Sequence, residues 1–528
     1  MGAQIDSYPT VLHMLAAAAE AAPDRTALVC GGDVLNYRDY LSRIAELAYE
    51  LQARGVAPGD RIVTLLSNSA DAAIATFAVQ AAGAQLVALN PAYTRDELAP
   101  IISDADPRVI LYDSDMEVRV DAFAAGQVCS MAIGKASRRL TEPGSVVTRP
   151  LLPPRPDWLS TLQYTGGTTG VPKGVNLSHQ AIAVNVAQRE ALLPTLDGEQ
   201  VMCITPLFHV YAVSMGLYLA ANCRGTLHIM QKFDAETVLR DIGRHKITFL
   251  SAAPTILLGL MRHASFGKAD LASLRVCSSG SAALPEDVLR RWESVTGCPV
   301  CEGYGQTEAG PVLTYNPLNG RRRPGTVGHA VPMTEIQIVD PETGTRQMPS
   351  GEAGEIRARG PQVMTGYRNR SAETAETLRD GWLYTGDIGR IDEDGYLTIC
   401  DRKKDMVVTA GYNVYPREIE EVLFGHPEIA DVAVVGVPDD YRGEALVALV
   451  VRVNPKLTRV AVMDYLSDRL TKYKWPRDVR FLDSLPKTAV AKTDKAALRR
   501  LLRDHNANVP ATKDRDDTTT ILQSGRPA

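Results

Sequence analysis

The 528-residue sequence lacks several common features, and each absence excludes a class of protein. It has no basic excess, because 57 Lys and Arg residues are outnumbered by 62 Asp and Glu, leaving a net charge of −5. Nucleic acid is therefore not an expected partner. No uninterrupted apolar run is long enough to cross a membrane, and the polar segment Met1–Pro9 has no basic-then-apolar signal pattern. These absences predict a cytoplasmic protein with no integral membrane segment.

Cysteine is also sparse. The eight cysteines are scattered along the chain, which fits a reducing compartment. Only Cys298 and Cys301 have CxxC spacing, and no second pair lies near them. A zinc or redox role is therefore not expected, and we interpret the pair as buried thiols.

What the sequence does have is length and a repeating pattern. A chain of 528 residues exceeds one ordinary core, so two or more domains are expected. Apolar helical faces alternate with short apolar strands, and this βαβ rhythm predicts a mainly parallel sheet covered by helices. In the first third, helices are expected at 40–51, 70–82 and 95–103, and strands at 61–66, 85–89 and 109–112.

The rhythm resumes after residue 174, where each expected strand ends in a loop of small and polar residues. These strands are expected at 201–206, 248–251, 274–278 and 300–302, with a helix from 285 to about 292. Ligands in open α/β sheets bind beyond the carboxyl ends of the strands, so we expect these loops to converge on one crevice.

The pattern of expected secondary structure changes twice more towards the C-terminus. From residue 325, short strands and turns, such as 336–340 and 354–359, are typical of a smaller β-rich subdomain. The segment 382–387 closes this subdomain, the charged cluster Asp401–Asp405 then marks the domain boundary, and a compact α+β pattern follows. The predicted fold class is therefore α/β. It has a large N-terminal domain of several subdomains (1–401), a small mobile α+β domain (407–503) and a disordered polar tail (504–528).

The densest motif is the glycine loop, residues 164–174 with the sequence YTGGTTGVPKG, which follows an extended segment at 158–163. Glycine permits positive φ and lets backbone N–H groups turn inward to form an anion-binding concavity. Threonine hydroxyls and Lys173 add further donors, so the loop predicts a polyphosphate ligand. It is not a Walker A motif, because Lys173 follows Pro172 and residues 174–177 separate the loop from a helix starting near Ser178.

The glycine loop and five further motifs together resemble the motifs of the acyl-adenylate-forming superfamily. The further motifs are at 303–311, 382–387, 401–405, 411–416 and 485–492. That superfamily includes acyl-CoA synthetases, peptide-synthetase adenylation domains and luciferases. The resemblance covers Tyr8–Arg500. Residues 401–405 and 411–416 resemble most the fatty-acyl-CoA synthetases, whereas 303–311 is shared with aryl-CoA ligases. The resemblance implies two steps: a carboxylate attacks the α-phosphate of ATP to give acyl-AMP and pyrophosphate, and a thiol then displaces AMP.

The resemblance also assigns the ATP site. It implies that the β- and γ-phosphates are bound by Thr165, Gly166, Thr168, Thr169, Gly170 and Lys173. Thr307 would contact the α-phosphate, and Glu308 would hold Mg²⁺, a hard cation suited to carboxylate and phosphate oxygen. The adenine slot is assigned to Gly280, Ser281, Ala282, Tyr304 and Gly305. Asp387 would accept from the ribose hydroxyls, and Arg402 would add a cation near the ribose and phosphate.

The segment 485–492 matches the C-terminal lysine motif of the superfamily. This implies that Lys492 bridges the attacking carboxylate and the α-phosphate, a task suited to a compact ammonium. Ala491 stands where the family has glycine, and Lys487 is the competing candidate. Since Lys492 and the glycine loop lie in different domains, the domains must close for the first step. The resemblance implies that the small domain then rotates about a hinge at 402–406, with Lys404 at its centre.

The acid site is expected beside His209, which we interpret as a gate or a carboxylate-positioning group. Carboxylates are already ionised at neutral pH, so the first step needs no general base. The expected acyl pocket is apolar and is formed by Val210, Tyr211, Met215, Ala252, Gly280 and Gly303. The two glycines are expected to leave depth for an alkyl chain or an aryl group. A medium- or long-chain fatty acid or another hydrophobic acid is the first expectation, with an aryl or branched acid as the alternative.

The expected thiol is CoA, so the predicted ligands are ATP, Mg²⁺, CoA and a carboxylic acid. Gly411 would line the pantetheine tunnel, and aromatic and basic groups for CoA are offered by Tyr441, Tyr473, Lys474 and Trp475. Two alternatives stay open: an enzyme that loads a carrier protein, and a nucleotide-binding protein without catalysis. The expected assembly is a monomer or a homodimer.

Overall fold

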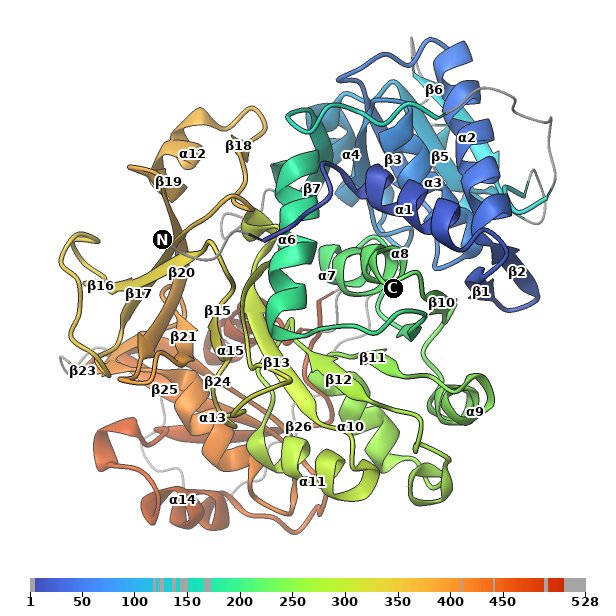
Figure 1. Cartoon of the computed structure of the whole chain (residues 1–528). Helices are drawn as coiled ribbons and strands as arrows, with labels where there is room; N and C mark the ends of the chain where they lie inside the picture. Colours follow the sequence, from blue (N-terminus) through green and yellow to red (C-terminus); the bar gives the residue numbers. More distant parts are fainter. Residues whose placement is uncertain are drawn as a thin grey trace. The chain divides into compact units, whose positions relative to one another are not determined.

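The structure is a computed structural model of the chain (Figure 1). It describes residues 5–116, 120–121, 123, 128–134, 139–142, 151–165, 172–409, 412–439, 442–488 and 492–507. The chain divides into two compact units. The first comprises Met1–Gln337, Arg357–Thr385 and Gly395–Leu397, and the second Ile338–Ile356, Gly386–Asp394 and Thr398–Ala528. Among the helices that the structure describes, none has the length and apolar character required to cross a membrane.

The first unit contains a seven-stranded sheet built from the predicted βαβ repeats. Its spatial order is β18 (Gly366–Tyr367), β8 (Lys173–Ser178), β7 (Leu159–Thr165), β4 (Gln85–Ala88), β3 (Arg61–Leu65), β5 (Val109–Asp113) and β6 (Cys129–Ile133). The strands from β7 to β6 are parallel, and β8 runs antiparallel to β7. The helices are α2 (Tyr37–Ala53), α3 (Ala70–Ala81) and α4 (Arg95–Ala105). Side-chain caps at Asn36, Ser69 and Thr94 fix where these helices begin.

A nine-stranded sheet forms the rest of the framework of this unit. Its order is β15 (His329–Ala330), β14 (Val312–Tyr315), β13 (Val300–Gly305), β12 (Val276–Ser279), β11 (Phe249–Ser251), β9 (Gln200–Cys203), β10 (Thr226–Ile229), β1 (Thr26–Cys30) and β2 (Asp33–Asn36). Neighbours from β9 to β13 are parallel. The carboxyl ends of these four strands therefore share one edge, as predicted, although β13 continues to Gly305 rather than ending at 302.

The remaining helical elements of the first unit cover these sheets. They are α1 (Val11–Ala21), α6 (His179–Leu192), α7 (Val210–Ala212), α8 (Leu219–Asn222), α9 (Ala235–His245), α10 (Pro254–Arg262), α11 (Glu286–Thr296), α12 (Ser371–Thr377), and the short turns η1 (Ser114–Met116), η2 (Val213–Tyr218), η3 (Phe266–Lys268) and η4 (Thr307–Ala309). The turn η2 is a π-helix that sequence periodicity did not indicate.

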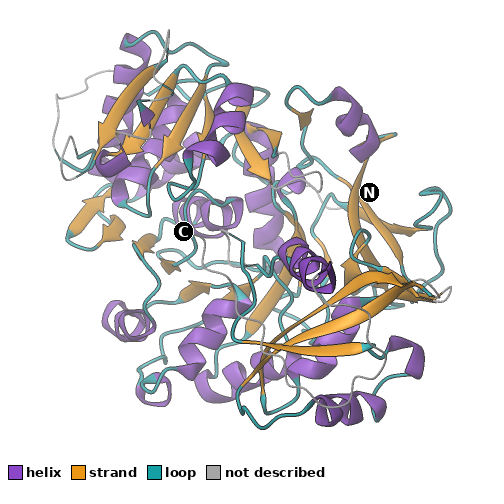
Figure 2. Ribbon diagram, turned by 180° about the vertical axis from the view of Figure 1, so that it is seen from behind, coloured by secondary structure: helices purple, strands orange, loops and turns teal. Residues whose placement is uncertain are grey.

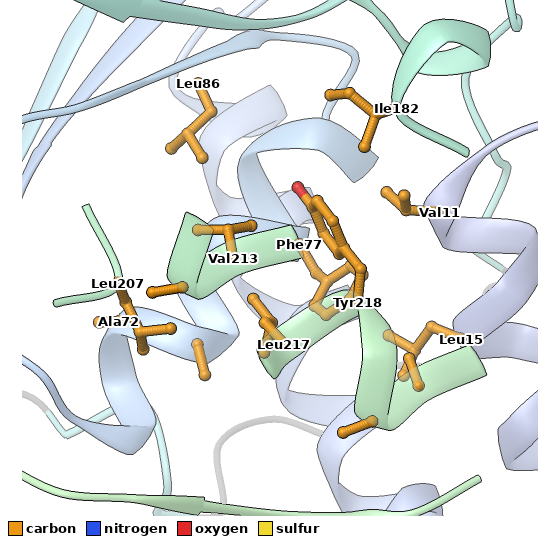
Figure 3. Packing of buried hydrophobic residues seen from close by; sticks show 14 of the residues in the cluster. Val11, Leu15, Ala72, Phe77, Leu86, Ile182, Leu207, Val213, Leu217 and Tyr218 are labelled. Carbon is orange, nitrogen blue, oxygen red and sulfur yellow. The ribbon is translucent and has the colours of Figure 1, made fainter. Parts of the chain in front are cut away.

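The core of the first unit is packed around α3, of which every residue is buried. Its alanines let neighbouring helices and strands approach closely, because the alanine side chain is small. Figure 3 shows Phe77 beside Tyr218, with Val11 and Leu15 of α1 close by, and the two rings meet edge to face at 5.5 Å. The one amide in this helix, Gln80, donates through Nε2 to Ser160 Oγ at 2.9 Å and to Tyr218 OH at 2.7 Å, whereas its buried Oε1 has no hydrogen-bond partner among the described residues.

The β-rich region predicted after residue 325 is a five-stranded sheet. Its order is β16 (Glu335–Val339), β17 (Gly354–Arg359), β20 (Trp382–Ile391) and β19 (Leu378–Arg379), with β21 (Leu397–Arg402) beside β20.

The second unit carries the expected α+β pattern, seen from behind in Figure 2. Its main sheet has the order β23 (Tyr412–Val414), β22 (Val407–Thr409), β25 (Gly443–Arg452) and β24 (Ile429–Asp439), with β26 (Asp478–Leu482) parallel to β25. The helical elements are α13 (Pro416–Phe424), α14 (Arg459–Ser467), η5 (Lys472–Lys474) and α15 (Lys495–Ala507). Alternate residues of β24 serve two cores, because successive side chains of a strand point to opposite faces. Val432 and Val434 join the cluster that includes residues of α13 and α14, whereas Ala433 and Val435 join that of α15.

The ends of the sequence patterns differ slightly from the structure. Helix α15 continues to Ala507, so the first four residues of the expected tail are helical, and residues 508–528 lie outside the described ranges. All eight cysteines are free. Cys298 and Cys301 are buried, as expected, and burial raises the pKa of each thiol to about 12.

Candidate active site

The two strands that flank the glycine loop hold its ends together. Thr165 at the end of β7 is paired with Lys173 at the start of β8. Ser178 then caps α6, because its Oγ accepts from the backbone N–H of Ala181 at 3.1 Å. The helix therefore begins where the sequence predicted, one full strand after the loop. The loop residues Gly166, Thr168, Thr169 and Gly170 lie outside the described residues.

Asp104 ties the strand before the loop to the segment after β18. The Tyr164 hydroxyl donates to Asp104 Oδ2 at 2.6 Å, and Asn369 Nδ2 donates to Oδ1 at 3.1 Å. Arg368 Nε donates to the Asp104 carbonyl at 2.6 Å. Burial and the adjacent carboxylate raise the pKa of Tyr164, so its hydroxyl stays a neutral donor. One flank of the loop is thereby fixed.

Tyr367 in β18 contacts two of the predicted site residues. Its ring centroid lies 5.2 Å from Lys173 Nζ, and its hydroxyl donates to Glu308 Oε1 at 2.8 Å. Burial, followed by the Glu308 charge, raises the pKa of Tyr367 far above its ordinary value. The lysine of the glycine loop and the carboxylate predicted to hold Mg²⁺ are thus joined through one side chain. Sequence reasoning missed Tyr367, since only the pairing of β18 with β8 brings it here.

The residues assigned to the adenine slot lie in the loop after β12 and at the carboxyl end of β13. Ser281 has φ of 70°, in the left-handed region that non-glycine residues rarely adopt, and such strained residues often occur at functional sites. A Cβ at Gly305 would lie 1.8 Å from the Pro311 carbonyl oxygen, so only glycine fits there. Tyr304 is partly buried and packs on the main core. Thr307 and Glu308 follow in η4.

His209 is held as the N-cap of α7. Its Nδ1 accepts from the Tyr211 backbone N–H at 3.2 Å, so the proton of the neutral ring is on Nε2. Two amides fix the preceding segment, because Gln163 Nε2 donates to the Phe208 carbonyl at 2.9 Å and Asn68 Oδ1 accepts from Leu207 N–H at 2.7 Å. The histidine therefore has a structural role besides any contact with substrate.

Tyrosine rings lie next to two of the predicted acyl residues, Gly280 and Gly303. Val210 is partly exposed, whereas Met215 and Ala252 are fully buried. The space beside Gly280 is taken by the ring of Tyr211, and that beside Gly303 by the ring of Tyr315. A glycine in the sequence shows that one position has no side chain, but it does not show whether the side chain of another residue fills that space.

In the second unit, Lys492 lies close to Asp387 and Arg402. Arg402 Nε is 3.6 Å from Asp387 Oδ1. Lys492 is partly buried, and this burial lowers its pKa to about 8; the Arg402 charge also lowers the pKa, while Asp387 opposes it. The competing Lys487 is engaged elsewhere, since its Nζ lies 2.7 Å from Asp431 Oδ2. Ala491 lies outside the described residues.

The residues predicted for the hinge and for CoA have mixed surroundings. Lys404 is exposed in the turn after β21. Lys474 Nζ pairs with Glu418 at 2.5 Å, and Trp475 Nε1 donates to the Leu470 carbonyl at 2.8 Å, so both polar groups are engaged within their unit. Tyr473 stacks on Tyr412 at 4.7 Å. Gly411 and Tyr441 lie outside the described residues.

Within the described ranges, no group of three or more His, Cys, Asp or Glu side chains is arranged to hold a metal ion. A divalent cation here would thus need ligands from a bound phosphate in addition to a carboxylate such as Glu308.

Comparison with known families identifies this arrangement. The profile of the AMP-binding enzymes matches residues 15–368, and that of their C-terminal domain matches residues 418–492. The chain therefore belongs to the AMP-binding enzymes, the acyl-adenylate-forming superfamily. Within that superfamily it is an AMP-forming acid–CoA ligase, so the alternative of a nucleotide-binding protein without catalysis is excluded.

Three relatives illustrate the range of the family. A long-chain-fatty-acid–CoA ligase of Bacillus subtilis is 37% identical, with 94% of this chain and 95% of that protein covered. A feruloyl-CoA synthase of an Amycolatopsis species is 35% identical, with 91% and 97% covered. The crystal structure of ATP-bound MatB from Rhodopseudomonas palustris has a TM-score of 0.85 at 33% identity, with 93% and 99% covered.

Proposed function

We propose that this enzyme activates a hydrophobic carboxylic acid with ATP and transfers it to CoA. In the first step a carboxylate oxygen attacks the α-phosphorus, forming acyl-AMP and releasing pyrophosphate. In the second, the CoA sulfur attacks the acyl carbon and AMP leaves. The observation that carries the proposal is the contact of one tyrosine, Tyr367, with both Lys173 and Glu308.

That contact matches the charge changes of the first step. Negative charge on the leaving pyrophosphate must be neutralised, and fixed cations and backbone donors do this best where water is excluded. Lys173 supplies a cation at the end of the glycine loop. Glu308 fits Mg²⁺, which binds through one or two carboxylates plus substrate phosphates, and the ion would neutralise phosphate charge. The glycine loop then acts as a clamp for the leaving group, with Thr307 near the α-phosphate.

Lys492 is proposed to stabilise the pentavalent phosphorus centre of the first step. Its neighbours Asp387 and Arg402 are the groups assigned to the ribose and the adjacent phosphate, which supports this role over Lys487. The glycine loop and Lys492 belong to different units, so the first step requires the units to approach. Rotation about 402–406 between the half-reactions would then remove the lysine and admit the thiol.

The acid is proposed to be hydrophobic because the residues assigned to its pocket are apolar. An amino acid would need an acidic partner for its ammonium group. The names of the relatives include a long-chain fatty acid and feruloyl, an acyl group that carries an aromatic ring, so both alkyl and aryl acids are candidates.

The test is acid-dependent exchange of labelled pyrophosphate into ATP, measured without CoA across a panel of carboxylic acids. We expect exchange with at least one hydrophobic acid, and AMP plus acyl-CoA when CoA is added. Exchange followed by transfer only to an acyl carrier protein would replace CoA as the acceptor. No exchange with any acid would refute the proposed first step.

A further inference from the structure

Tyrosine rings stand beside both glycines of the proposed acyl site. Strands β12 and β13 are parallel neighbours (Figure 1), and Gly280 and Gly303 lie just beyond or within their carboxyl ends. A Cβ at Gly280 would lie 3.1 Å from Tyr211 Cε2, and one at Gly303 only 2.5 Å from Tyr315 Cζ. The rings of Tyr211 and Tyr315 therefore fill the space that a larger side chain at Gly280 or Gly303 would occupy.

Strand register explains the position of Tyr315. Gly303 in β13 is directly opposite Tyr315 in the antiparallel strand β14. Directly opposed residues project to the same face of a sheet, and glycine offers no side chain to share that face. The ring of Tyr315 therefore lies across Gly303. Tyr211 reaches Gly280 from α7, a separate element.

The two tyrosine side chains are joined by hydrogen bonds to Ser278, near the carboxyl end of β12. The Tyr211 hydroxyl donates to the Ser278 carbonyl at 3.0 Å, and Ser278 Oγ lies 3.2 Å from this hydroxyl and 2.9 Å from Tyr315 OH. Ser278 is 0% exposed and Tyr315 is 2% exposed. Moving either ring aside would leave a buried hydroxyl without its partner, which is unfavourable. The pair is thus held in place.

An acyl group that ends at these rings would have little room between them and the residues assigned to the adenine slot. Gly280 is followed by Ser281 and Gly303 by Tyr304, both assigned to the adenine slot, and adjacent Cα atoms are only about 3.8 Å apart. The two rings therefore pack against glycines that directly precede residues assigned to the adenine slot. Met215 and Ala252, also assigned to the pocket, are 0% exposed and so line no open tunnel.

We propose that Tyr211 and Tyr315, linked by Ser278, form the end wall of the acyl site and select a compact acid. A compact acid here is a short alkyl chain or a single ring, as opposed to a long-chain fatty acid. This inference rests on the proposed function, because it assumes that the acyl group lies at Gly280 and Gly303. Both aryl and long-chain ligases occur among relatives of similar identity, so identity does not decide between them.

The expected discrimination is large. When an acid has one methylene group more than a hydrophobic pocket can accept, kcat/KM falls by about 10- to 200-fold. We therefore expect kcat/KM for hexanoate or benzoate to exceed that for dodecanoate and hexadecanoate by at least about tenfold.

The experiment measures AMP formation by the full chain with ATP, Mg²⁺ and CoA. The acids are the even saturated series from butanoate to hexadecanoate, each below its micelle concentration, with benzoate and cinnamate as ring acids. Preference for butanoate and hexanoate or for the ring acids supports the wall and identifies which compact class fits. Preference for dodecanoate or hexadecanoate overturns the wall but leaves the proposed function intact. No activity with any acid would instead count against the proposed function.

Two variants test the wall itself. Tyr315→Ala should move the preferred acid to a longer chain and lower kcat/KM for the shortest acids. Tyr315→Phe keeps the ring and should keep the cut-off. An equal loss for every acid in Tyr315→Ala, with the preferred acid unchanged, would show that Tyr315 does not set acid length. If Tyr315→Ala does not fold, Tyr211→Leu gives the same comparison at the second ring, and the wild-type profile alone can overturn the wall.

Discussion

Replacing Tyr367 by phenylalanine removes one hydroxyl and keeps the ring beside Lys173. The lost hydrogen bond, 2.8 Å long, is donated to the Glu308 carboxylate. A hydrogen bond to a charged group contributes about 1.5 to 3 kcal/mol, which corresponds to a factor of about 10 to 150. Loss of a group that orients a metal-binding carboxylate typically weakens metal affinity about 10- to 100-fold. We therefore expect Tyr367→Phe to raise the half-saturating Mg²⁺ concentration about tenfold or more.

The assay is acid-dependent pyrophosphate–ATP exchange as a function of free Mg²⁺, at saturating ATP and acid. Tyr164→Phe is the matched control, because it also removes a hydroxyl bonded to a carboxylate, that of Asp104, at 2.6 Å. The control should leave the half-saturating Mg²⁺ concentration unchanged, whatever it does to the rate. An unchanged Mg²⁺ dependence in Tyr367→Phe, or an equal shift in both variants, would refute the assigned role of Tyr367.

Three further predictions concern the second unit. Lys492→Ala should abolish pyrophosphate exchange, whereas Lys487→Ala should retain it; the reverse order would exchange the two assignments. Because burial lowers the pKa of Lys492 to about 8, the lysine is charged below this pH and loses its proton above it. The kcat/KM of the first step should therefore fall as pH rises through about 8, and Lys492→Arg, which stays charged, should show no such fall in its residual activity; an identical alkaline limb in both proteins would assign the titration to another group. Lys404→Pro fixes one backbone φ in the proposed hinge, so thioester formation should fail while exchange persists, and equal loss of both would contradict a hinge there.

The sequence predicted elements whose signals are local. Capping side chains such as Ser69 and Ser178 stand immediately before helices, and the helical and strand periods are visible in the residues themselves. The separation of the glycine loop from α6 was also predictable, because residues 174–177 already argued against a helix at that point, although the strand β8 found there was not predicted. These features depend on interactions between residues only a few positions apart.

The contacts that the sequence did not reveal join residues far apart in the chain. Tyr367 reaches Glu308 only because β18 pairs with β8, and Tyr315 covers Gly303 only because of the register of β13 and β14. No local pattern encodes such a register. The rings beside Gly280 and Gly303 were not foreseen for this reason, since composition identifies a small residue and packing decides what occupies the space beside it.

The most direct test of the account follows the carboxylate oxygen. An acid labelled with heavy oxygen in both carboxylate positions is converted with ATP and CoA, and the released AMP and pyrophosphate are analysed by mass spectrometry. If the carboxylate attacks the α-phosphorus and the thiol then cleaves the acyl carbon–oxygen bond, AMP must carry one labelled oxygen and pyrophosphate none. Unlabelled AMP, or label in pyrophosphate or inorganic phosphate, would contradict an acyl-adenylate intermediate in this enzyme.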